Sequence, residues 1–290
     1  MGEHSSGGVK DTSVGGLPVR PERPADAGWL ALRMAADDEA RSATLEPLIN
    51  PLVEWLQAAH PAGTVNVVDL GAGTGSNAHW LAPRLPFAQH WTLVDHDAHL
   101  LSRADPPASF TGRTGKLEDI GRILAEAAAD RHYPTALLTC SALLDVLNAA
   151  EIEAACAAAA KSSCAVLFSL SVTGNVSLSP KDPMDAALAA AFDEHQRRDG
   201  RLGPDAPATA EAALRRQGMK VRTAATNWEL DATSAPLFRT WLEEWVEAAV
   251  EQDAGLADRS RQWVRQRLEQ LESGELSATV GHLDILALPG

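Results

Sequence analysis

The sequence contains few cysteines, few basic residues and few aromatic rings other than tryptophan. Three cysteines in 290 residues are an odd number, which does not fit a closed disulfide framework. Each lies in a stretch that is typical of a buried strand or an alanine-rich helix. We therefore expect Cys140, Cys156 and Cys164 to be small core residues in a reducing compartment. No grouping of cysteine, histidine and acidic residues has the spacing of metal ligands, so we expect no metal.

Basic residues are scarce as well, with 25 against 39 acidic residues and a net charge of −14. Nucleic-acid binding depends largely on neutralising phosphates, so we do not expect a broad basic surface for nucleic acid. No apolar run reaches the length that spans a bilayer. The first residues also lack the charged-then-apolar pattern of a secretory signal. The composition predicts an acidic, cytoplasmic protein with neither a nucleic-acid nor a membrane partner.

The most informative stretch is 65–75, VNVVDLGAGTG, which is followed by a helix-like segment and then by WTLVD ending at Asp95. The apolar, β-branched run predicts a buried strand. Gly71, Gly73 and Gly75 then allow a sharp turn and a close approach of the backbone to a ligand. A strand, a glycine-rich turn, a helix and a second strand ending in an acid indicate the nucleotide-binding half of a doubly wound α/β fold.

The spacing of the glycines distinguishes between nucleotides. In the dinucleotide fingerprint G-x-G-x-x-G the third glycine would fall at position 76, where this chain has Ser76. A phosphate-binding loop would place lysine and then serine or threonine after the glycines, and neither follows here. The pattern D-x-G-x-G-x-G, from Asp69 to Gly75, instead resembles motif I of the class I S-adenosylmethionine (SAM) methyltransferases.

This resemblance implies a set of cofactor-binding residues. The turn would carry the amino-acid half of SAM, and Asp95 would bind the ribose hydroxyls, with His96 beside it. The residues of this half are Asp69, Gly71, Ala72, Gly73, Gly75, Asp95 and His96. Two alternatives remain: Asp69 could stabilise the turn by accepting its backbone N–H groups, and Asp95 could be a solvated helix cap. Asp97 is expected to be the N-cap of the next helix.

The adenine contact in this family comes from the loop after the third strand. Leu117 and Glu118 occupy that place, with Asp119 as a second candidate acid. The acid is not at the usual position, so the two acids could equally be helix-starting residues.

The tip of the fourth strand, CSALLD, matches the position that faces both methyl group and acceptor in the family. Cys140 and Ser141 would line the site there. Asp145 is a candidate base or acceptor-orienting group, and a helix-capping acid is the alternative. The stretch lacks the D/N-P-P-Y/F signature of enzymes that methylate amino groups of nucleic acids.

His195 is the other candidate general base, in the segment FDEHQRRDG at the end of an expected helix. A cluster of histidine, glutamine, arginine and aspartate above the strand ends would suit a polar or anionic acceptor. The alternative is a solvated helix end, where histidine and arginine are favoured.

Strand-like and helix-like segments alternate along the chain, which predicts an α/β fold with a doubly wound, mostly parallel sheet. The expected strands are 65–70, 91–95, 108–111, 136–140, 164–172, 221–230 and 279–288. The family resemblance implies seven strands in the order 3-2-1-4-5-7-6, with the last strand antiparallel.

The chain divides into a disordered tail at 1–25, an N-terminal helical cap at 26–62 and a SAM-binding domain at 63–290. Helical insertions are expected at 180–205 and 233–273. Trp241, Trp245 and Trp263 have helical spacing and are expected in the core of the second insertion. Trp228 could wall an acceptor pocket.

These observations predict a SAM-dependent methyltransferase that acts on a small-molecule acceptor, as a monomer or homodimer. An SN2-like transfer needs chiefly that the acceptor be held close and aligned. Two alternatives remain open: a SAM-binding enzyme of another reaction type, such as decarboxylation or cyclisation, and a non-catalytic methyltransferase-like subunit.

Overall fold

The computed structural model describes residues 27–115, 119–128 and 134–290. The expected tail at 1–25 and the predicted adenine-contacting pair, Leu117 and Glu118, lie outside the described residues. The strands are β1 (Thr64–Leu70), β2 (Ala88–Asp95), β3 (Ser109–Thr114), β4 (Thr135–Ser141), β5 (Ala165–Ser179), β6 (Lys220–Ala225), β7 (Trp228–Leu230) and β8 (Ser277–Leu288).

Helices connect these strands. They are α1 (Ala27–Ser42), α2 (Asn50–Ala59), α3 (Ser76–Leu81), α4 (Ala98–Leu101), α5 (Ile120–Ala128), α6 (Ala149–Lys161), α7 (Asp185–Gln196), α8 (Ala206–Arg216), α9 (Ala235–Gln252) and α10 (Ala257–Glu272). Short helical turns include the π-helical η1 (Leu45–Ile49) and the 3₁₀ turns η4 (Leu144–Val146) and η6 (Gly203–Asp205). No helix of the described ranges is long and apolar enough to cross a membrane.

The sheet has the order β3-β2-β1-β4-β5-β8-β6, and β7 also pairs with β8. The pairs from β3 to β5 are parallel, and β8 is antiparallel to β5, β6 and β7. This confirms the predicted doubly wound α/β fold, with β8 as the expected antiparallel last strand. The carboxyl ends of the parallel strands therefore lie along one edge, where ligands bind in open α/β sheets.

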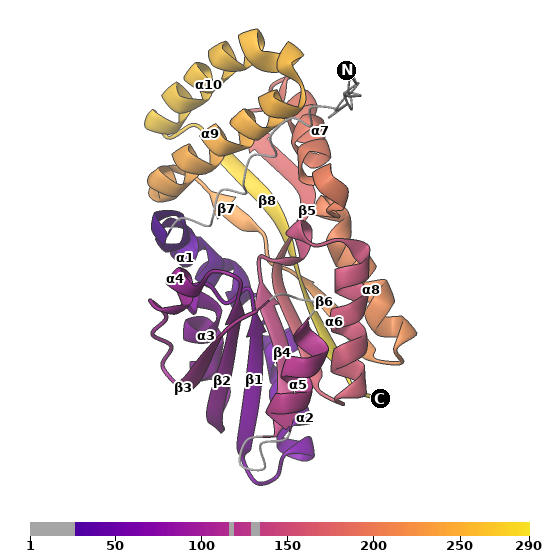
Figure 1. Cartoon of the computed structure of the whole chain (residues 1–290). Coiled ribbons are helices and arrows are strands. Elements are labelled where there is room, and N and C mark those ends of the chain that lie inside the picture. The colour runs from indigo at the N-terminus through magenta and orange to yellow at the C-terminus, as the bar shows by residue number, and fades with distance from the viewer. Residues whose placement is uncertain (1–26, 116–118, 129–133) are drawn as a thin grey trace, which may run out of the picture.

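Both faces of the sheet are covered (Figure 1). One core joins α2 and α3 to β1 and β2, with Leu52, Leu56 and Trp91 fully buried. The other joins α5, α6 and α8 to β4 and β5, and it contains all three cysteines, which are free and buried. Strands covered on both faces have to be apolar on both, which explains the unbroken apolar runs of the sequence.

A third core lies beyond the edge of the parallel strands (Figure 1). β4 pairs with β5 only as far as Ser169, whereas β5 continues alongside β8 to Ser179. Helices α7, α9 and α10 pack on this extension. Trp241, Trp245 and Trp263 are buried there, as predicted. We refer to the extension and these three helices as the upper lobe.

The structure corrects the prediction of one strand over 221–230. This stretch forms two strands, β6 and β7, separated by Thr226 and Asn227. At the break, the amide of Thr226 still donates to the carbonyl of His282 at 3.0 Å, and side chains add further bonds to β8. The amide of His282 donates to Asn227 Oδ1 at 3.3 Å, and Thr226 Oγ1 donates to Asp284 Oδ1 at 2.8 Å.

Candidate active site

The glycine turn, residues 71–75, joins β1 to α3 at the carboxyl edge of the sheet. Gly71, Gly73 and Gly75 have φ values of 61°, 53° and 86°. Residues with a side chain rarely adopt these values, so the three glycines are needed for the backbone path. The amide of Gly75 donates to the carbonyl of Ala72 at 2.8 Å, and the amide of Ala72 donates to that of Val94 at 3.1 Å. The turn is thus tied to β2.

Two leucines from other elements lie on the glycine turn. A β-carbon at Gly71 would lie 2.8 Å from Cδ1 of Leu143, which follows β4. A β-carbon at Gly73 would lie 3.7 Å from Cδ1 of Leu30 in α1. The turn is therefore walled by apolar groups, and α1 forms part of the site.

Asp95 ends β2 beside this turn, and its side chain is only 6% exposed. Its Oδ2 accepts the amide of Gly73 at 2.8 Å and its Oδ1 accepts the amide of Asp97 at 2.9 Å. The exposed His96 places Nδ1 3.2 Å from Oδ1. Asp97 caps α4 as predicted, accepting the amide of His99 at 2.8 Å. Asp95 is thus a buried acid held by the turn, and each carboxylate oxygen retains a further lone pair.

Asp69 lies under the turn and is 1% exposed. Its Oδ1 accepts from Nδ2 of Asn77 at 2.7 Å, and its Oδ2 is buried without a partner among the described residues. Burial raises the pKa of Asp69 to about 7, although the Asn77 hydrogen bond and the charge of Arg41 oppose the shift. The expected alternative, that Asp69 accepts backbone N–H groups of the turn, gives way to this side-chain contact.

Arg41, in the last turn of α1, connects this region to the rest of the sheet. It donates to Asn77 Oδ1 at 3.0 Å and to Ser169 Oγ at 3.3 Å. The carboxylate of Asp284 also attracts the Arg41 guanidinium. That carboxylate accepts the amide of Leu170 at 2.7 Å, and burial raises its pKa. Neither Arg41 nor Asn77 was predicted from the sequence.

The segment after β4 brings Leu143 to the turn and Asp145 beside it in the chain. Cys140 is 1% exposed in the sheet core, where burial raises the pKa of its thiol, while Ser141 is partly exposed. Desolvation raises the pKa of the Asp145 carboxyl group, and the positive charges of Arg33 and Arg201 oppose that shift.

Arg33 belongs to a cluster that sequence reasoning missed. Its Nε donates to Asp37 Oδ2 at 2.8 Å and its Nη2 donates to Oδ1 at 3.2 Å. Its Cζ lies 5.1 Å from the ring centroid of Trp228. Asp37 also accepts from Nε1 of Trp228 at 2.9 Å. Trp29, Arg33 and Asp37 recur every four residues, which places them on one face of α1. That spacing is the signal that could have identified the cluster.

His282 completes this cluster from β8. Its ring centroid lies 4.9 Å from that of Trp228. Burial and the charge of Arg33 lower the pKa of His282 to about 3. The ring is therefore neutral, and Nδ1 donates to the carbonyl of Val280 at 3.0 Å.

His195 lies at the end of α7, with a side chain that is 28% exposed. Its Nε2 is 3.5 Å from Oε2 of Glu251 in α9. The neighbouring Arg198 contacts the same carboxylate, at 3.0 Å. The contact of His195 with Glu251 therefore lies within the upper lobe, between the ends of α7 and α9.

Asp119 pairs with Arg122 at 3.1 Å, as a helix-starting acid does. In the described part of the chain, no group of three or more His, Cys, Asp or Glu side chains could hold a metal ion.

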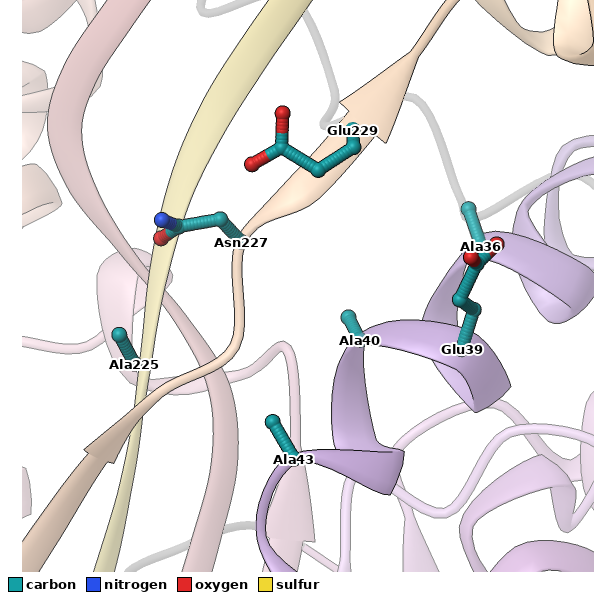
Figure 2. A pocket seen from close by; sticks show the side chains of 7 residues that line it. All are labelled: Ala36, Glu39, Ala40, Ala43, Ala225, Asn227 and Glu229. Carbon is teal, nitrogen blue, oxygen red and sulfur yellow. The ribbon is translucent and has the colours of Figure 1, made fainter.

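Two hollows lie along β7 and the β5–β8 extension. Figure 2 shows the first, of about 260 Å³, between alanines of α1 and the β6–β7 segment; it is lined by Ala36, Glu39, Ala40, Ala43, Ala225, Asn227 and Glu229. The second, of about 470 Å³, shares Ala225 and Asn227 with it. Neither includes the glycine turn, which Leu30 and Leu143 cover.

Comparisons with known proteins give no sequence relative. No family model matches the chain, and no curated protein matches it. Solved structures do match. The cyclopropane synthase MmaA2 from Mycobacterium tuberculosis is 12% identical, with a TM-score of 0.43, over 77% of this chain and 78% of that one. Phosphoethanolamine N-methyltransferase 2 of Haemonchus contortus, in complex with SAM, is 14% identical, with a TM-score of 0.40, over 83% and 53%.

A SAM-dependent methyltransferase from Geobacter sulfurreducens, in complex with S-adenosyl-L-homocysteine (SAH), is 16% identical, with a TM-score of 0.39, over 89% of this chain and 98% of that one. Class I SAM-dependent methyltransferases are thus among the solved structures that this chain resembles. At TM-scores below 0.5 these similarities assign no activity to it, and the fold class rests on the strand order itself.

Proposed function

We propose that this protein binds SAM at the glycine turn and transfers its methyl group to a small-molecule acceptor. The observation that carries the proposal is the position of Asp95. It is a buried carboxylate at the tip of β2 that contacts the amide of Gly73 in the turn. A carboxylate so placed can accept hydrogen bonds from the two hydroxyls of a ribose.

The residues present fit this cofactor. Gly71, Gly73 and Gly75, all with positive φ, have no side chains, so at these three positions the backbone of the turn is open to close approach by a ligand. Leu30 and Leu143 would then form apolar walls on the methionine side. When bound, SAM supplies an electrophilic methyl group on a sulfonium centre.

The protein would contribute alignment and exclusion of water. Helix α1 covers the turn, and the segment after β4 brings Leu143 and then Asp145 to the acceptor side. Orientation of an acceptor in a near-attack geometry is the main source of rate in such a transfer.

A hydroxyl or ammonium acceptor also has to lose a proton. We propose that Asp145 accepts it, because desolvation raises the pKa of its carboxyl group and so makes it a stronger base. The position of Asp145 two residues beyond Leu143, which touches Gly71, supports this role. His195 is the second proposed base; its contact with Glu251 would hold the ring in place.

Calorimetry with SAM and SAH tests the cofactor half. We expect both to bind, and Asp95→Ala to weaken binding about tenfold or more through loss of charge-assisted hydrogen bonds. Asp97→Ala is the matched control, because this neighbouring acid caps α4. Its affinity should stay near that of the wild type. If the wild-type protein binds neither compound, the proposed function is wrong.

Turnover is tested with SAM that carries a labelled methyl group and with a low-molecular-mass cell extract as acceptor pool. We expect label in a small molecule, and we expect Asp145→Asn to lose transfer while retaining SAH affinity. Equal transfer by Asp145→Asn and loss by His195→Ala would assign the base to His195 instead.

A further inference from the structure

Helix α1 lies outside the strand-turn-helix unit, yet its last turn is bonded into that unit. Arg41 is 2% exposed and donates to Asn77 Oδ1 in α3 and to Ser169 Oγ in β5. These partners are 36 and 128 residues away in the sequence. Both bonds come from Nη2, while Nε is buried without a partner among the described residues. Burying a guanidinium without hydrogen bonds is costly, so these two bonds matter for the position of Arg41.

Asn77 is the partner that reaches the glycine turn. Its Nδ2 donates to Asp69 Oδ1 at 2.7 Å and to Thr139 Oγ1 at 3.2 Å. Asp69 precedes the turn and Asn77 follows it, so one side-chain amide bridges the two ends of the turn. Arg41 donates to the oxygen of the same amide, which favours the orientation that aims the amide nitrogen at Asp69 and Thr139.

Charge surrounds Arg41 on several elements. Asp37 and Asp38 of α1, Asp69 of β1 and Asp284 of β8 all attract it, while burial opposes its charged form. Its Cζ lies 3.8 Å from the centroid of the Trp80 ring, and Cζ of Arg84 lies 4.0 Å from the same centroid. The two arginines therefore share one tryptophan, but only Arg41 is bonded to Asn77.

We propose that Arg41 is a positioning residue for the cofactor. It acts through Asn77 and Asp69 to hold the ends of the glycine turn together, and it keeps α1 in place with Leu30 against Gly73. This rests on the proposed function, because it assigns to α1 a part in SAM binding at the same turn. Loss of Arg41 should weaken cofactor binding although Arg41 does not itself contact the cofactor.

The test compares two arginines that stack on Trp80. Arg41→Met removes the hydrogen bonds to Asn77 and Ser169 and retains an apolar stem; Arg84→Met removes only stacking and a bond to the Trp80 carbonyl. By calorimetry with SAH we expect Arg41→Met to bind about tenfold more weakly, as for the loss of hydrogen bonds to a charged group. Arg84→Met should bind as the wild type does.

A double-mutant cycle separates positioning from a general loss of packing. If Arg41 acts through Asn77, then Arg41→Met should weaken SAH binding far less in an Asn77→Ala background. Amide hydrogen exchange without ligand gives a second readout. Exchange at Gly73 and Gly75 should accelerate in Arg41→Met and remain unchanged in Arg84→Met.

If Arg41→Met does not fold, Arg41→Lys replaces it in every comparison, since its ammonium retains the charge but ends about one bond short of Nη2, the atom that makes both hydrogen bonds. If the wild-type protein binds SAH and the Arg41 and Arg84 variants bind it with equal affinity, the inference is overturned and the proposed function remains intact. An additive cycle would overturn it as well. Absence of SAH binding in the wild type would instead remove the proposed function.

Discussion

Asp69 and His282 are both buried, and burial moves their pKa values in opposite directions. The pKa of Asp69 rises to about 7 and that of His282 falls to about 3, because burial disfavours the charged form of each. His282 is therefore a neutral ring that packs against Trp228. Asp69 is different, since its carboxyl group ionises near neutral pH. Its charge attracts Arg41, and its Oδ1 accepts the hydrogen bond from Asn77.

Asp69 should make the protein less stable as the pH rises toward 7. Its pKa in the folded protein is above its unfolded value of 3.8, so between these values the folded state holds a proton that the unfolded chain has released. The free energy of unfolding should therefore fall between about pH 4 and pH 7, with the Asp69 contribution lost above about pH 7. The free energy of unfolding of the Asp69→Asn variant should fall less over this range.

Urea denaturation at several pH values measures this difference. Glu46→Gln, at an exposed position, serves as the control and should follow the wild type. Parallel curves for Asp69→Asn and the wild type would contradict the raised pKa of Asp69.

At the scale of elements, the glycine turn and α1 lie against each other and form the candidate site together. Leu143 can approach the turn only because Gly71 has no β-carbon, whereas Leu30 lies at ordinary contact distance from the β-carbon position of Gly73. The stripe Leu30, Arg33, Asp37 and Arg41 lies on one side of α1 and meets the turn, β7 and β5 in succession. The N-terminal helix is therefore a wall of the candidate site as well as a cover for the sheet.

Gly71→Ala should destabilise the protein more than Gly63→Ala does. Both glycines have positive φ, 61° and 70°, so alanine is strained at each by about 1 kcal/mol or more. At Gly71 the β-carbon would also meet Leu143, whereas nothing lies within 4 Å at Gly63. The clash should add about 1–3 kcal/mol.

The free energy of unfolding of each variant, measured in urea, checks this expectation. Leu143→Ala in the Gly71→Ala background should relieve the clash with the new β-carbon but not the backbone strain at position 71. Equal losses at Gly63 and Gly71 would show that Leu143 moves aside at no cost.

At the scale of the whole molecule, two strands join the upper lobe to the parallel part of the sheet. β5 contributes Phe168 to the sheet core and Leu178 to the upper lobe, and β8 contributes Ile285 and Ala278 in the same way. Figure 1 shows both strands running through the two regions. Because the same strands support both cores, we expect the described fold to unfold as one unit.

Trp245→Ala tests this coupling. Trp245 is 2% exposed and stacks on Trp241 with centroids 5.5 Å apart. Its loss should reduce the free energy of unfolding by about 3–5 kcal/mol. Near-ultraviolet circular dichroism, which follows the tryptophans, and amide exchange in β1 should report the same transition. Loss of the tryptophan signal before β1 exchanges would show that the upper lobe unfolds separately.

The sequence by itself determined most of the elements and the order in which they alternate. Buried parallel strands need unbroken apolar runs, and helices need apolar residues at a 3.6-residue period, so a short stretch of sequence is enough to predict either element. The glycine spacing and Asp95 are local for the same reason, since a turn and the strand tip beside it are built from short segments. The strand order was implied by the resemblance of those residues to a known family.

Tertiary structure alone decided which distant groups meet. No local pattern predicts that Arg41 bonds Asn77 and Ser169, or that Arg33 lies near His282, because these contacts depend on how α1 crosses the sheet. The division of 221–230 into β6 and β7 likewise depends on contacts with β8, where the Thr226 hydroxyl donates to Asp284 and the Asn227 side chain accepts the amide of His282. Side-chain hydrogen bonds between remote segments have no period in the sequence, so the chain has to fold before they exist.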